Sequence, residues 1–414
     1  MEQLMKQMEI VKSDVGMSWE MVKIPEVLFF MEGPGVRNTQ FTTQGVKLLN
    51  VGNINDGLLD LDATTKFISE KEAYGKYKHF LVEDGDLLIA SSGIVVDNFH
   101  NKITWAKAED LPLCMNTSTI RFKTLDSNIL DIRFFSYFIK TKLFTDQLRK
   151  LITGSAQLNF GPSHLKQISL PLPPLPIQKR IAEILDAADA LKRKDQELLK
   201  KYDELAQAIF IDMFGDPVKN EKGWETKKFQ ELGTLDRGVS KHRPRNAPEL
   251  LGGKYPLIQT GDVANSGGII TKYRSTYSEI GLKQSKMWSK GTLCITIAAN
   301  IAKTGILDFD ACFPDSIVGF KPNDKVSNSV FVQFWIGFLQ KILEDNAPES
   351  AQKNINLEIL RGLDVICPPV ELQNKFEKII EQLNLVKSSN SNFVADNLFQ
   401  TLIQKAFKGE LVAE

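Results

Sequence analysis

The sequence predicts an α+β fold in which two mixed α/β globular domains are separated by two long helices that form an antiparallel coiled coil. The two halves are expected to be related by a pseudo-two-fold internal repeat. Three observations predict this architecture. The 414 residues have an ordinary content of 43% hydrophobic and 25% charged residues, one segment recurs later in the chain, and each copy carries a heptad pattern. At roughly 100–200 residues per domain, the length leaves room for several domains.

An internal repeat organises the chain. The motif Ser-Ala-Gln at residues 155–157 recurs at 350–352, an offset of 195 residues, and the same offset relates Gln178 to Gln373. A period this long indicates two copies of a composite unit, each a variable part followed by a shared segment, rather than a solenoid. The alternative is a duplication without functional consequence. The constant spacing beside the divergent remainder favours a fixed scaffold that carries two different binding parts.

The shared segments carry heptad patterns. In the first copy, apolar residues stand seven apart in one seam position, with a second seam position four residues later. Sustained heptads are typical of a coiled coil, so we expect long helices over about 176–213 and about 371–407. Pairing of these helices with each other is the simplest solution, and pairing with helices of other proteins is the alternative. The predicted seam residues are Ile177, Ile181, Ile184, Leu191, Leu198, Leu205, Leu372, Phe376, Ile379, Leu383, Val386 and Phe393.

These patterns divide the chain into four consecutive segments. The first globular domain covers residues 1–150, with a leader of unassigned role at 1–18, and the first spacer segment covers 151–218. The second globular domain covers 219–349, and the second spacer segment covers 350–414. Prolines precede each predicted long helix and glycine follows it, which suits the start and the end of a helix.

Each globular domain is predicted to combine strands with a closing helix. Apolar and β-branched runs predict strands at 46–51, 86–90 and 117–122, and again at 255–259, 293–297 and 316–320. Apolar helices are expected at 129–151 and 329–344. Their many aromatic side chains are expected in the core rather than in a ligand site.

The clearest candidate for a functional surface is a basic loop. Residues 237–245 hold five cationic or titratable side chains, and residues 37–40 occupy the corresponding loop of the first domain. Such a loop suits phosphate contacts, and its arginines can read guanine edges in a major groove; a solvated loop is the alternative. Local chemistry selects as candidate DNA-contact residues Arg37, Asn38, Thr39, Gln40, Asn53, Ser91, Ser92, Arg237, Ser240, Lys241, His242, Arg243, Arg245, Gln259, Thr260, Lys272, Arg274, Asn300 and Lys303.

Charge is divided unevenly along the chain. Residues 219–349 hold 18 basic and 14 acidic residues, whereas 19–150 hold 16 and 17. Over the whole chain, 51 basic and 51 acidic residues cancel, although phosphate neutralisation supplies much of the affinity for nucleic acid. We therefore expect the positive charge either to lie on one face or to be supplemented by a partner subunit.

No motif for catalysis is recognisable. The sequence lacks GxxxxGK[ST], and its Pro-Pro pairs lack the Asn or Asp that an adenine methyltransferase motif needs before them. The four histidines have no metal-ligand spacing, so no metal site is expected. Four separated cysteines indicate reduced thiols in the cytoplasm, and no apolar run is long enough to span a membrane.

Taken together, these motifs resemble the specificity subunit of type I restriction–modification enzymes. The features that carry the resemblance are Gly-Ser-Ala-Gln at 154–157, Leu-Pro-Leu-Pro-Pro-Leu-Pro-Ile-Gln at 170–178, the heptad helix, and Met-Phe-Gly-Asp at 213–216. Their counterparts are Ser-Ala-Gln-Lys-Asn at 350–354, Cys-Pro-Pro-Val-Glu-Leu-Gln at 367–373, and Ala-Phe-Lys-Gly-Glu-Leu at 406–411. The resemblance covers the chain from about Trp19 onward.

The resemblance implies a non-catalytic subunit that binds double-stranded DNA. Each target-recognition domain would read one half of a bipartite site, and the coiled coil would set the distance between the half-sites. It also implies docking of two methylation subunits and of restriction/translocase subunits, with S-adenosylmethionine, ATP and Mg held by those partners and no cofactor on this chain. A coiled-coil adaptor with two protein-binding heads is the alternative.

Overall fold

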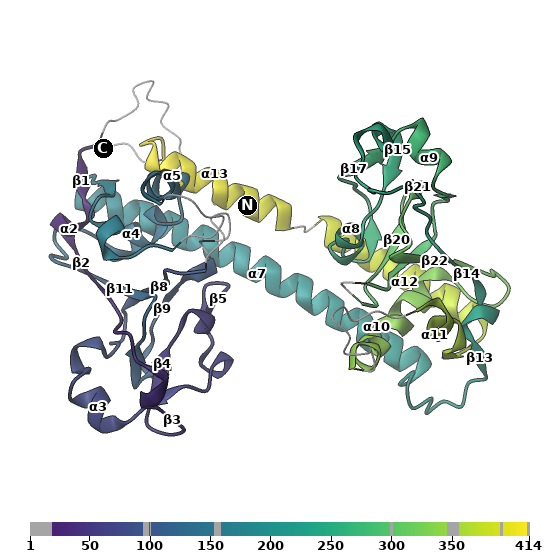
Figure 1. The fold of residues 1–414 in the computed structure, drawn as a ribbon, viewed down its shortest axis with the longest axis horizontal. Coiled ribbons are helices and arrows are strands. Elements are labelled where there is room, and N and C mark those ends of the chain that lie inside the picture. Colours follow the sequence, from purple (N-terminus) through teal and green to yellow (C-terminus); the bar gives the residue numbers. More distant parts are fainter. Residues whose placement is uncertain are drawn as a thin grey trace. The chain divides into compact units, whose positions relative to one another are not determined.

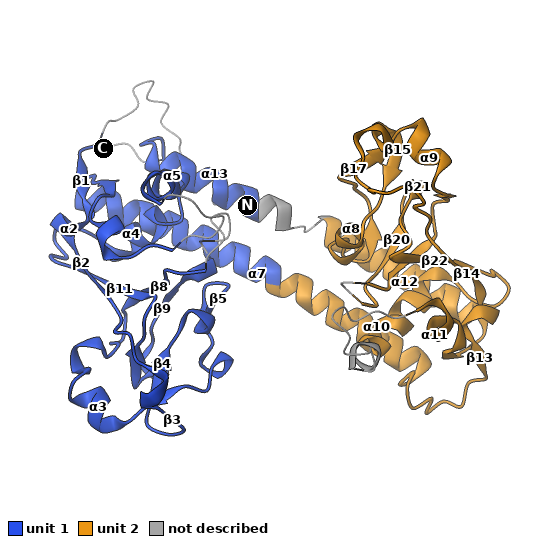
Figure 2. Ribbon diagram, viewed as in Figure 1, with its two compact units in different colours: residues 1–196, 392–414 blue, residues 197–391 orange. Residues whose placement is uncertain are grey.

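The structure, a computed structural model, describes residues 19–93, 99, 101–152, 159–298, 301–345, 356–389 and 392–411, apart from the side chains of 341–345, 389 and 392–395. The chain forms two compact units (Figure 2). Unit 1 takes residues 1–196 and 392–414, and unit 2 takes residues 197–391. Each unit therefore contains part of both spacer segments. The four consecutive segments of the sequence are not the compact bodies of the structure.

Unit 1 is built on two four-stranded sheets and two two-stranded pairs, β1-β12 and β5-β6. The sheet β2-β11-β8-β9 is antiparallel throughout, and all four residues of β8 are buried, as suits an apolar run in the middle of a sheet. In the sheet β10-β4-β7-β3, β10 and β4 are parallel. The strands are β1 (Met21–Lys23), β2 (Leu28–Glu32), β3 (Phe41–Thr42), β4 (Val46–Leu49), β5 (Ile54–Asn55), β6 (Leu58–Leu59), β7 (Phe67–Ile68), β8 (Leu87–Ala90), β9 (Ile103–Trp105), β10 (Leu113–Met115), β11 (Thr119–Thr124) and β12 (Ser169–Pro171).

Unit 2 repeats most of this topology and adds a fifth strand, β16, parallel to β20. Its order β14-β22-β19-β20 is antiparallel in the same way, β15 and β21 are parallel as β4 and β10 are, and β13 pairs with β23 as β1 pairs with β12. The internal repeat therefore extends to the divergent parts of the sequence. The strands are β13 (Thr226–Lys228), β14 (Gly233–Arg237), β15 (Leu251–Leu257), β16 (Ile269–Ile270), β17 (Ser275–Tyr277), β18 (Met287–Trp288), β19 (Leu293–Thr296), β20 (Thr304–Leu307), β21 (Ala311–Cys312), β22 (Ile317–Pro322) and β23 (Asp364–Ile366).

All six strands predicted from the sequence are present, as β4, β8, β11, β15, β19 and β22. The single helix predicted over 129–151 is wrong, because the structure has two helices there. The first ends at Phe138, and Thr141 caps the second by accepting a hydrogen bond from the Phe144 N–H. The short helices of both units are α2 (Ile24–Val27), α3 (Glu70–Tyr74), α4 (Ile132–Phe138), α5 (Lys142–Leu151), α6 (Pro162–Leu165), α8 (Thr260–Ala264), α9 (Glu279–Lys283), α10 (Ser329–Asp345) and α11 (Leu357–Gly362).

The spacer helices are long, as the heptads predict. Helix α7 (Leu175–Phe214) has 40 residues, and the second spacer segment forms α12 (Val370–Ser389) and α13 (Asn392–Phe407) (Figure 1). One helix was predicted over 371–407; residues 390–391, between α12 and α13, lie outside the described residues. In unit 2 the pairing is antiparallel, because Asp203 pairs with Lys387 whereas the later residue Phe210 packs on the earlier residue Phe376.

The inward face of these helices differs from the predicted seam. Ile181 is fully buried, but Leu191, Leu198 and Leu205 are 37%, 37% and 46% exposed. The buried row lies one residue later and begins with Gln178, followed by Leu185 and, in unit 2, Ala206. The sequence pattern was misleading because this row includes polar residues whose partners lie far away in the chain.

The second spacer segment shows the same one-residue shift. Gln373 and Ile380 face inward, whereas Ile379 is half-buried and Val386 is 43% exposed. Of the other predicted seam residues, Phe376 is fully buried, and Phe393 lies in α13 with its side chain outside the described part. The remaining four are half-buried: Ile177, Ile184, Leu372 and Leu383.

Each aromatic core is completed by a spacer helix. In unit 1 the Phe407 ring lies 4.9 Å from that of Phe134, and in unit 2 the Phe214 ring lies 5.0 Å from that of Phe331. Phe134, Phe331 and Trp335 are fully buried, so the predicted core role of the aromatic helices is confirmed. The two repeated Phe residues at the ends of the spacer segments thus close equivalent cores.

Candidate nucleic-acid interface

The basic loop of unit 2 follows β14 and is organised by its own arginine. The Arg243 guanidinium donates to the backbone carbonyls of Ser240, at 2.6 Å, and His242, at 2.9 Å. Ser240 is buried, whereas Arg237 and Lys241 are exposed. These hydrogen bonds therefore hold the loop in a defined conformation, unlike a freely solvated segment.

One carboxylate holds two of the loop's arginines. Arg245 donates to the Asp315 carboxylate, and Arg243 lies 3.7 Å from its other oxygen. A single negative charge faces two positive charges, so the loop keeps an excess positive charge. The sequence separates these partners by about 70 residues, so local reasoning did not connect them.

Gln284 fixes the tip of the same loop. Its side-chain carbonyl accepts hydrogen bonds from the backbone N–H groups of Lys241, at 2.7 Å, and His242, at 3.0 Å. Because these bonds use only the backbone, the Lys241 ammonium remains exposed. Within the described part of the chain, neither Lys241 nor Arg237 has an ion-pair partner for its side chain.

A second group lies at the start of α8. Gln259 is exposed and Thr260 half-buried, and Asp262 accepts a hydrogen bond from the Gln259 N–H at 2.9 Å. Arg274 lies 3.6 Å from the Asp262 carboxylate, which brings it to this group. One further candidate lies elsewhere. Lys303 lines a cavity of unit 2, and Asn300 lies outside the described residues.

The sequence interpretation missed Tyr273. Its ring is 46% exposed, stands between the exposed residues Lys272 and Arg274, and meets Phe309 edge-on at 5.3 Å between ring centroids. An exposed aromatic ring between two cations suits stacking on a base beside phosphate contacts. The triplet Lys-Tyr-Arg was the signal in the sequence.

The corresponding loop of unit 1 is smaller and largely committed to structure. Arg37, Asn38 and Thr39 are exposed. The Gln40 amide, however, donates to Glu72 at 2.8 Å and to the Tyr77 hydroxyl at 3.2 Å, which ties the loop to α3. Arg37 is thus the one cation of this loop.

Two other candidates of unit 1 are buried. Asn53 is fully buried, with its amide donating to the Asp60 carbonyl and its side-chain oxygen accepting from the Asn50 N–H and the Thr64 hydroxyl. It has no surface to offer a base, so we withdraw it from the contact set. Ser91 is 1% exposed and its neighbour Ser92 half-buried, which leaves Ser91 with no surface to offer either.

A repeated glutamine joins each globular part to its spacer helix. Gln178 donates to the carbonyls of Ile129, at 2.9 Å, and Pro173, at 2.7 Å, and accepts from the Asp131 N–H at 2.9 Å. In unit 2, Gln373 bonds in the same way to the Val326 and Pro368 carbonyls and the Asn328 N–H. The glutamine was constant in the repeat because a buried amide with three partners cannot be replaced without leaving them unsatisfied.

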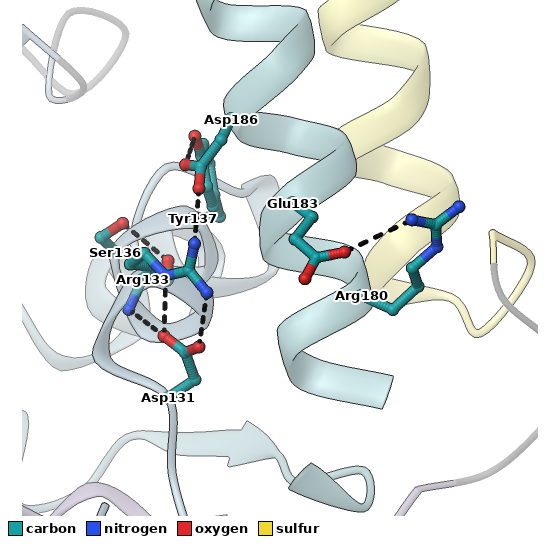
Figure 3. A network of polar contacts seen from close by, with 7 residues as sticks. All are labelled: Asp131, Arg133, Ser136, Tyr137, Arg180, Glu183 and Asp186. Carbon is teal, nitrogen blue, oxygen red and sulfur yellow. Dashed lines mark hydrogen bonds and ion pairs between the residues drawn. The ribbon is translucent and has the colours of Figure 1, made fainter. Parts of the chain in front are cut away.

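Unit 1 adds a charged network between α4 and α7 (Figure 3). Arg133 bridges Asp131, at 3.0 Å, and Asp186, at 2.9 Å, and the Tyr137 hydroxyl donates to Asp186 at 2.7 Å. Burial, together with the hydrogen bond to Asp186, raises the pKa of Tyr137, so the phenol keeps its proton and remains a donor. This network orients the globular part of unit 1 on its helix.

Groups typical of catalysis are not assembled in the part of the chain that the structure describes. It contains no cluster of His, Cys, Asp or Glu that could hold a metal ion. The four cysteines are free, and burial raises the pKa of Cys114 to about 11, so its thiolate is disfavoured. None of the described helices is long and apolar enough to cross a membrane.

The repeated architecture, with its unlike polar loops on a helical scaffold, defines a two-domain binding protein. The model of the type I restriction modification DNA specificity domain matches residues 17–201 and again 221–391. The chain belongs to this family and carries two of its domains, as the sequence motifs predicted.

Named relatives agree with this assignment. The type I restriction enzyme MjaVIII specificity subunit of Methanocaldococcus jannaschii is 31% identical over 196 residues, which cover 46% of this chain and 45% of the relative. The EcoBI specificity subunit of Escherichia coli is 27% identical over 285 residues, 60% of each chain. The chain therefore spans about half the length of these relatives.

Solved structures show the same fold. The type I restriction–modification S subunit from M. genitalium aligns with a TM-score of 0.54 at 16% identity, over 96% of this chain and 97% of that chain. A structure that describes complex assembly and conformational transition of a type I system aligns with a TM-score of 0.50, over 97% of this chain. The α+β fold with two repeated domains and long helices is confirmed.

Proposed function

We propose that this chain reads a bipartite DNA sequence for a type I restriction–modification complex, each unit contacting one half-site. The observation that carries the proposal is the pair of units with an equivalent arrangement of central strands and different exposed loops. A shared framework with divergent loops suits two recognition tasks of the same kind, because loops can change without altering the core.

The unit 2 surface supports base and backbone contact. Arg237 and Lys241 are exposed cations on the basic loop, and Tyr273 offers a ring between two further cations. Cations without ion-pair partners can neutralise phosphates, whereas Arg243 and Arg245 reach DNA only by exchanging Asp315 for it. In unit 1, Arg37, Asn38 and Thr39 are the exposed counterparts.

The scaffold is proposed to set the distance between the half-sites. Helix α7 has 40 residues without interruption, and at about 1.5 Å per residue it is a rod of roughly 60 Å. Inserting one heptad into α7 and one into α12 should lengthen the preferred gap between half-sites. An unchanged gap would refute the role of the helices as a ruler.

Partner subunits are proposed to dock on the exposed apolar positions of the spacer helices. Three leucines that stand seven residues apart on α7 are each more than one-third exposed: Leu191 in unit 1, and Leu198 and Leu205 in unit 2. Apolar side chains at this spacing suit a partner helix. We propose two methylation subunits and the restriction/translocase subunits as these partners, with S-adenosylmethionine, ATP and Mg bound by them.

The deciding experiment exchanges residues 219–349 for those of a relative and maps methylated sites in the host. We expect one half of the methylated sequence to change and the other half to stay. An unchanged sequence with a changed set of bound proteins would favour an adaptor with two protein-binding heads instead. We also propose a cytoplasmic location, supported by the four free cysteines.

A further inference from the structure

Both units contain a cavity at an equivalent place, beside the spacer helices. The cavity of unit 1 has a volume of about 850 Å³ and is lined by α5, α7, α13 and the β5–β6 turn. That of unit 2 has about 440 Å³ and is lined by α7, α10, α12 and the segment before β16. Since the shared architecture produces both, a cavity in this place needs no separate function.

The charge of the two cavities, in contrast, is not shared. Five cationic side chains line the unit 1 cavity, with two carboxylates: Lys140, Lys142, Arg149, Lys192, Arg193, Asp56 and Asp189. Two cationic side chains and one carboxylate line the unit 2 cavity: Lys303, Lys387 and Asp203. The repeat offset relates Lys192 to Lys387 and Asp189 to Asn384, all of which line their cavities.

Most of the unit 1 cations already have carboxylate partners. Lys192 pairs with Asp396 at 2.6 Å, Arg193 with Asp189 at 2.9 Å, and Lys142 with Asp146 at 2.8 Å. These ion pairs leave little of their charge for a ligand. Arg149 lies 3.4 Å from the Asp146 carboxylate, which leaves Lys140 as the remaining cation of this lining.

Lys140 is the exception. It is half-buried, and among the described residues it has no carboxylate within ion-pair distance and no hydrogen-bond acceptor for its ammonium. Its ammonium lies over the face of the Tyr137 ring, 5.0 Å from the ring centroid. Burial is the main cause that lowers the pKa of Lys140; Arg193 and Lys192 act in the same direction, and Asp189 and Asp186 act against it.

In unit 2 the cation is absent. The residues that bond to the repeated glutamines, Asp131 and Asn328, are 197 apart, and the same spacing relates Lys140 to Gly337, which lines the unit 2 cavity. A half-buried lysine without an ion-pair partner is less favourable for folding than a paired one. Its presence in one unit alone points to a ligand that supplies the missing negative charge.

We propose that the unit 1 cavity binds a phosphate group, with Lys140 as the residue that supplies the charge. A phosphate carries enough negative charge to compensate Lys140 beside two already paired cations, and an ammonium acts on it as a point charge. The group can come from the backbone of bound DNA or from a free nucleotide, and the two sources share this chemistry. The DNA source rests on the proposed function, whereas the free-nucleotide source does not.

The test compares Lys140→Met with the full-length wild type, using inorganic pyrophosphate in calorimetry and a duplex of unrelated sequence in a salt titration. For a free-nucleotide site, we expect Lys140→Met to weaken pyrophosphate binding at least tenfold and leave the duplex unaffected. For a DNA phosphate, we expect the slope of log affinity against log salt to fall by about one.

Two further variants keep the test decisive. Lys142→Met removes a rim cation that is already paired with Asp146, and we expect it to change either affinity less than twofold. Lys140→Arg keeps the positive charge and should bind both probes as the wild type does. Lys140→Met should melt at the same or a higher temperature, because it removes an uncompensated charge. The proposal is overturned if neither probe binds the wild type, if Lys140→Met changes neither affinity, or if Lys142→Met weakens them equally. A negative result with both probes would not change the expected outcome of the domain-exchange experiment. The phosphate-site proposal and the proposed function can therefore fail separately.

Discussion

Unit 1 and unit 2 share their framework and differ where a ligand would meet them. The framework includes the antiparallel sheet order, the glutamine with three buried bonds, and the Phe that closes the aromatic core. The differences lie in the loop after β2 or β14 and in the cavity beside the spacer helices. The duplication therefore preserved the contacts that join each globular part to its spacer helix. The exposed loops and the cavity lining diverged.

The largest effect is expected at the aromatic closure. Phe214→Ala removes a fully buried ring from unit 2 and should destabilise that unit by about 3–5 kcal/mol. Phe407→Ala in unit 1 should cost less, because Phe407 is only half-buried. Urea unfolding followed by hydrogen exchange of each unit measures both. Equal losses would contradict the expected dependence on burial, and a loss confined to the other unit would contradict the assignment of each Phe to its own core.

The repeated glutamine gives a sharper comparison. Gln178→Leu and Gln373→Leu each remove three hydrogen bonds to two carbonyls and one N–H, so each should cost about 3 kcal/mol. The exposed neighbours provide matched controls, and Lys179→Ala and Lys375→Ala should stay within about 0.5 kcal/mol. Thermal unfolding distinguishes these outcomes. If the two leucine variants differed strongly from each other, the glutamines would not be equivalent.

The loop of unit 2 should respond asymmetrically to charge. Arg237→Ala and Lys241→Ala remove cations without ion-pair partners in the described structure, and each should weaken DNA binding by about 1 kcal/mol. Asp315→Asn frees Arg243 and Arg245, so it should strengthen binding to any duplex several-fold and reduce discrimination between sequences. Binding titrations with cognate and unrelated duplexes measure this. Arg243→Ala or Arg245→Ala is expected to affect one half-site by roughly 1–3 kcal/mol.

The smallest effect concerns two equivalent ion pairs between spacer helices. Lys192 pairs with Asp396 in unit 1 as Lys387 pairs with Asp203 in unit 2. Because the carboxylates are 49% and 63% exposed, solvent screening should limit each pair to about 0.5 kcal/mol. Double-mutant cycles to alanine should give similar coupling energies in both units. A coupling above about 2 kcal/mol in one unit alone would break the equivalence.

Much of the fold could be predicted because it depends on local pattern. The six strands are short apolar runs, and the 40-residue helix follows from sustained heptads, so neighbouring residues carry the signal. The inward row of the helices could not be predicted in this way. Gln178 and Lys192 look like surface residues until the Ile129 carbonyl and Asp396, far away in the chain, satisfy them.

The residues of the candidate interface also fall into two groups: those that local sequence reveals and those whose role depends on the fold. The basic loop and the Lys-Tyr-Arg triplet can be recognised as local runs of residues. The duplication that indicated the family can be recognised as a repeated motif. The role of Asp315, the burial of Asn53 and the unpaired ammonium of Lys140 are not visible, since each depends on which distant groups the fold brings near.

The sequence by itself therefore determined the repeat, the helical rods and the family, because periodicity and motif are properties of neighbouring residues. Only the tertiary structure decided which side chains face inward and which charges keep no partner. Burial and ion pairing are decided by residues far apart in the chain, and their energies exist only once the chain has folded.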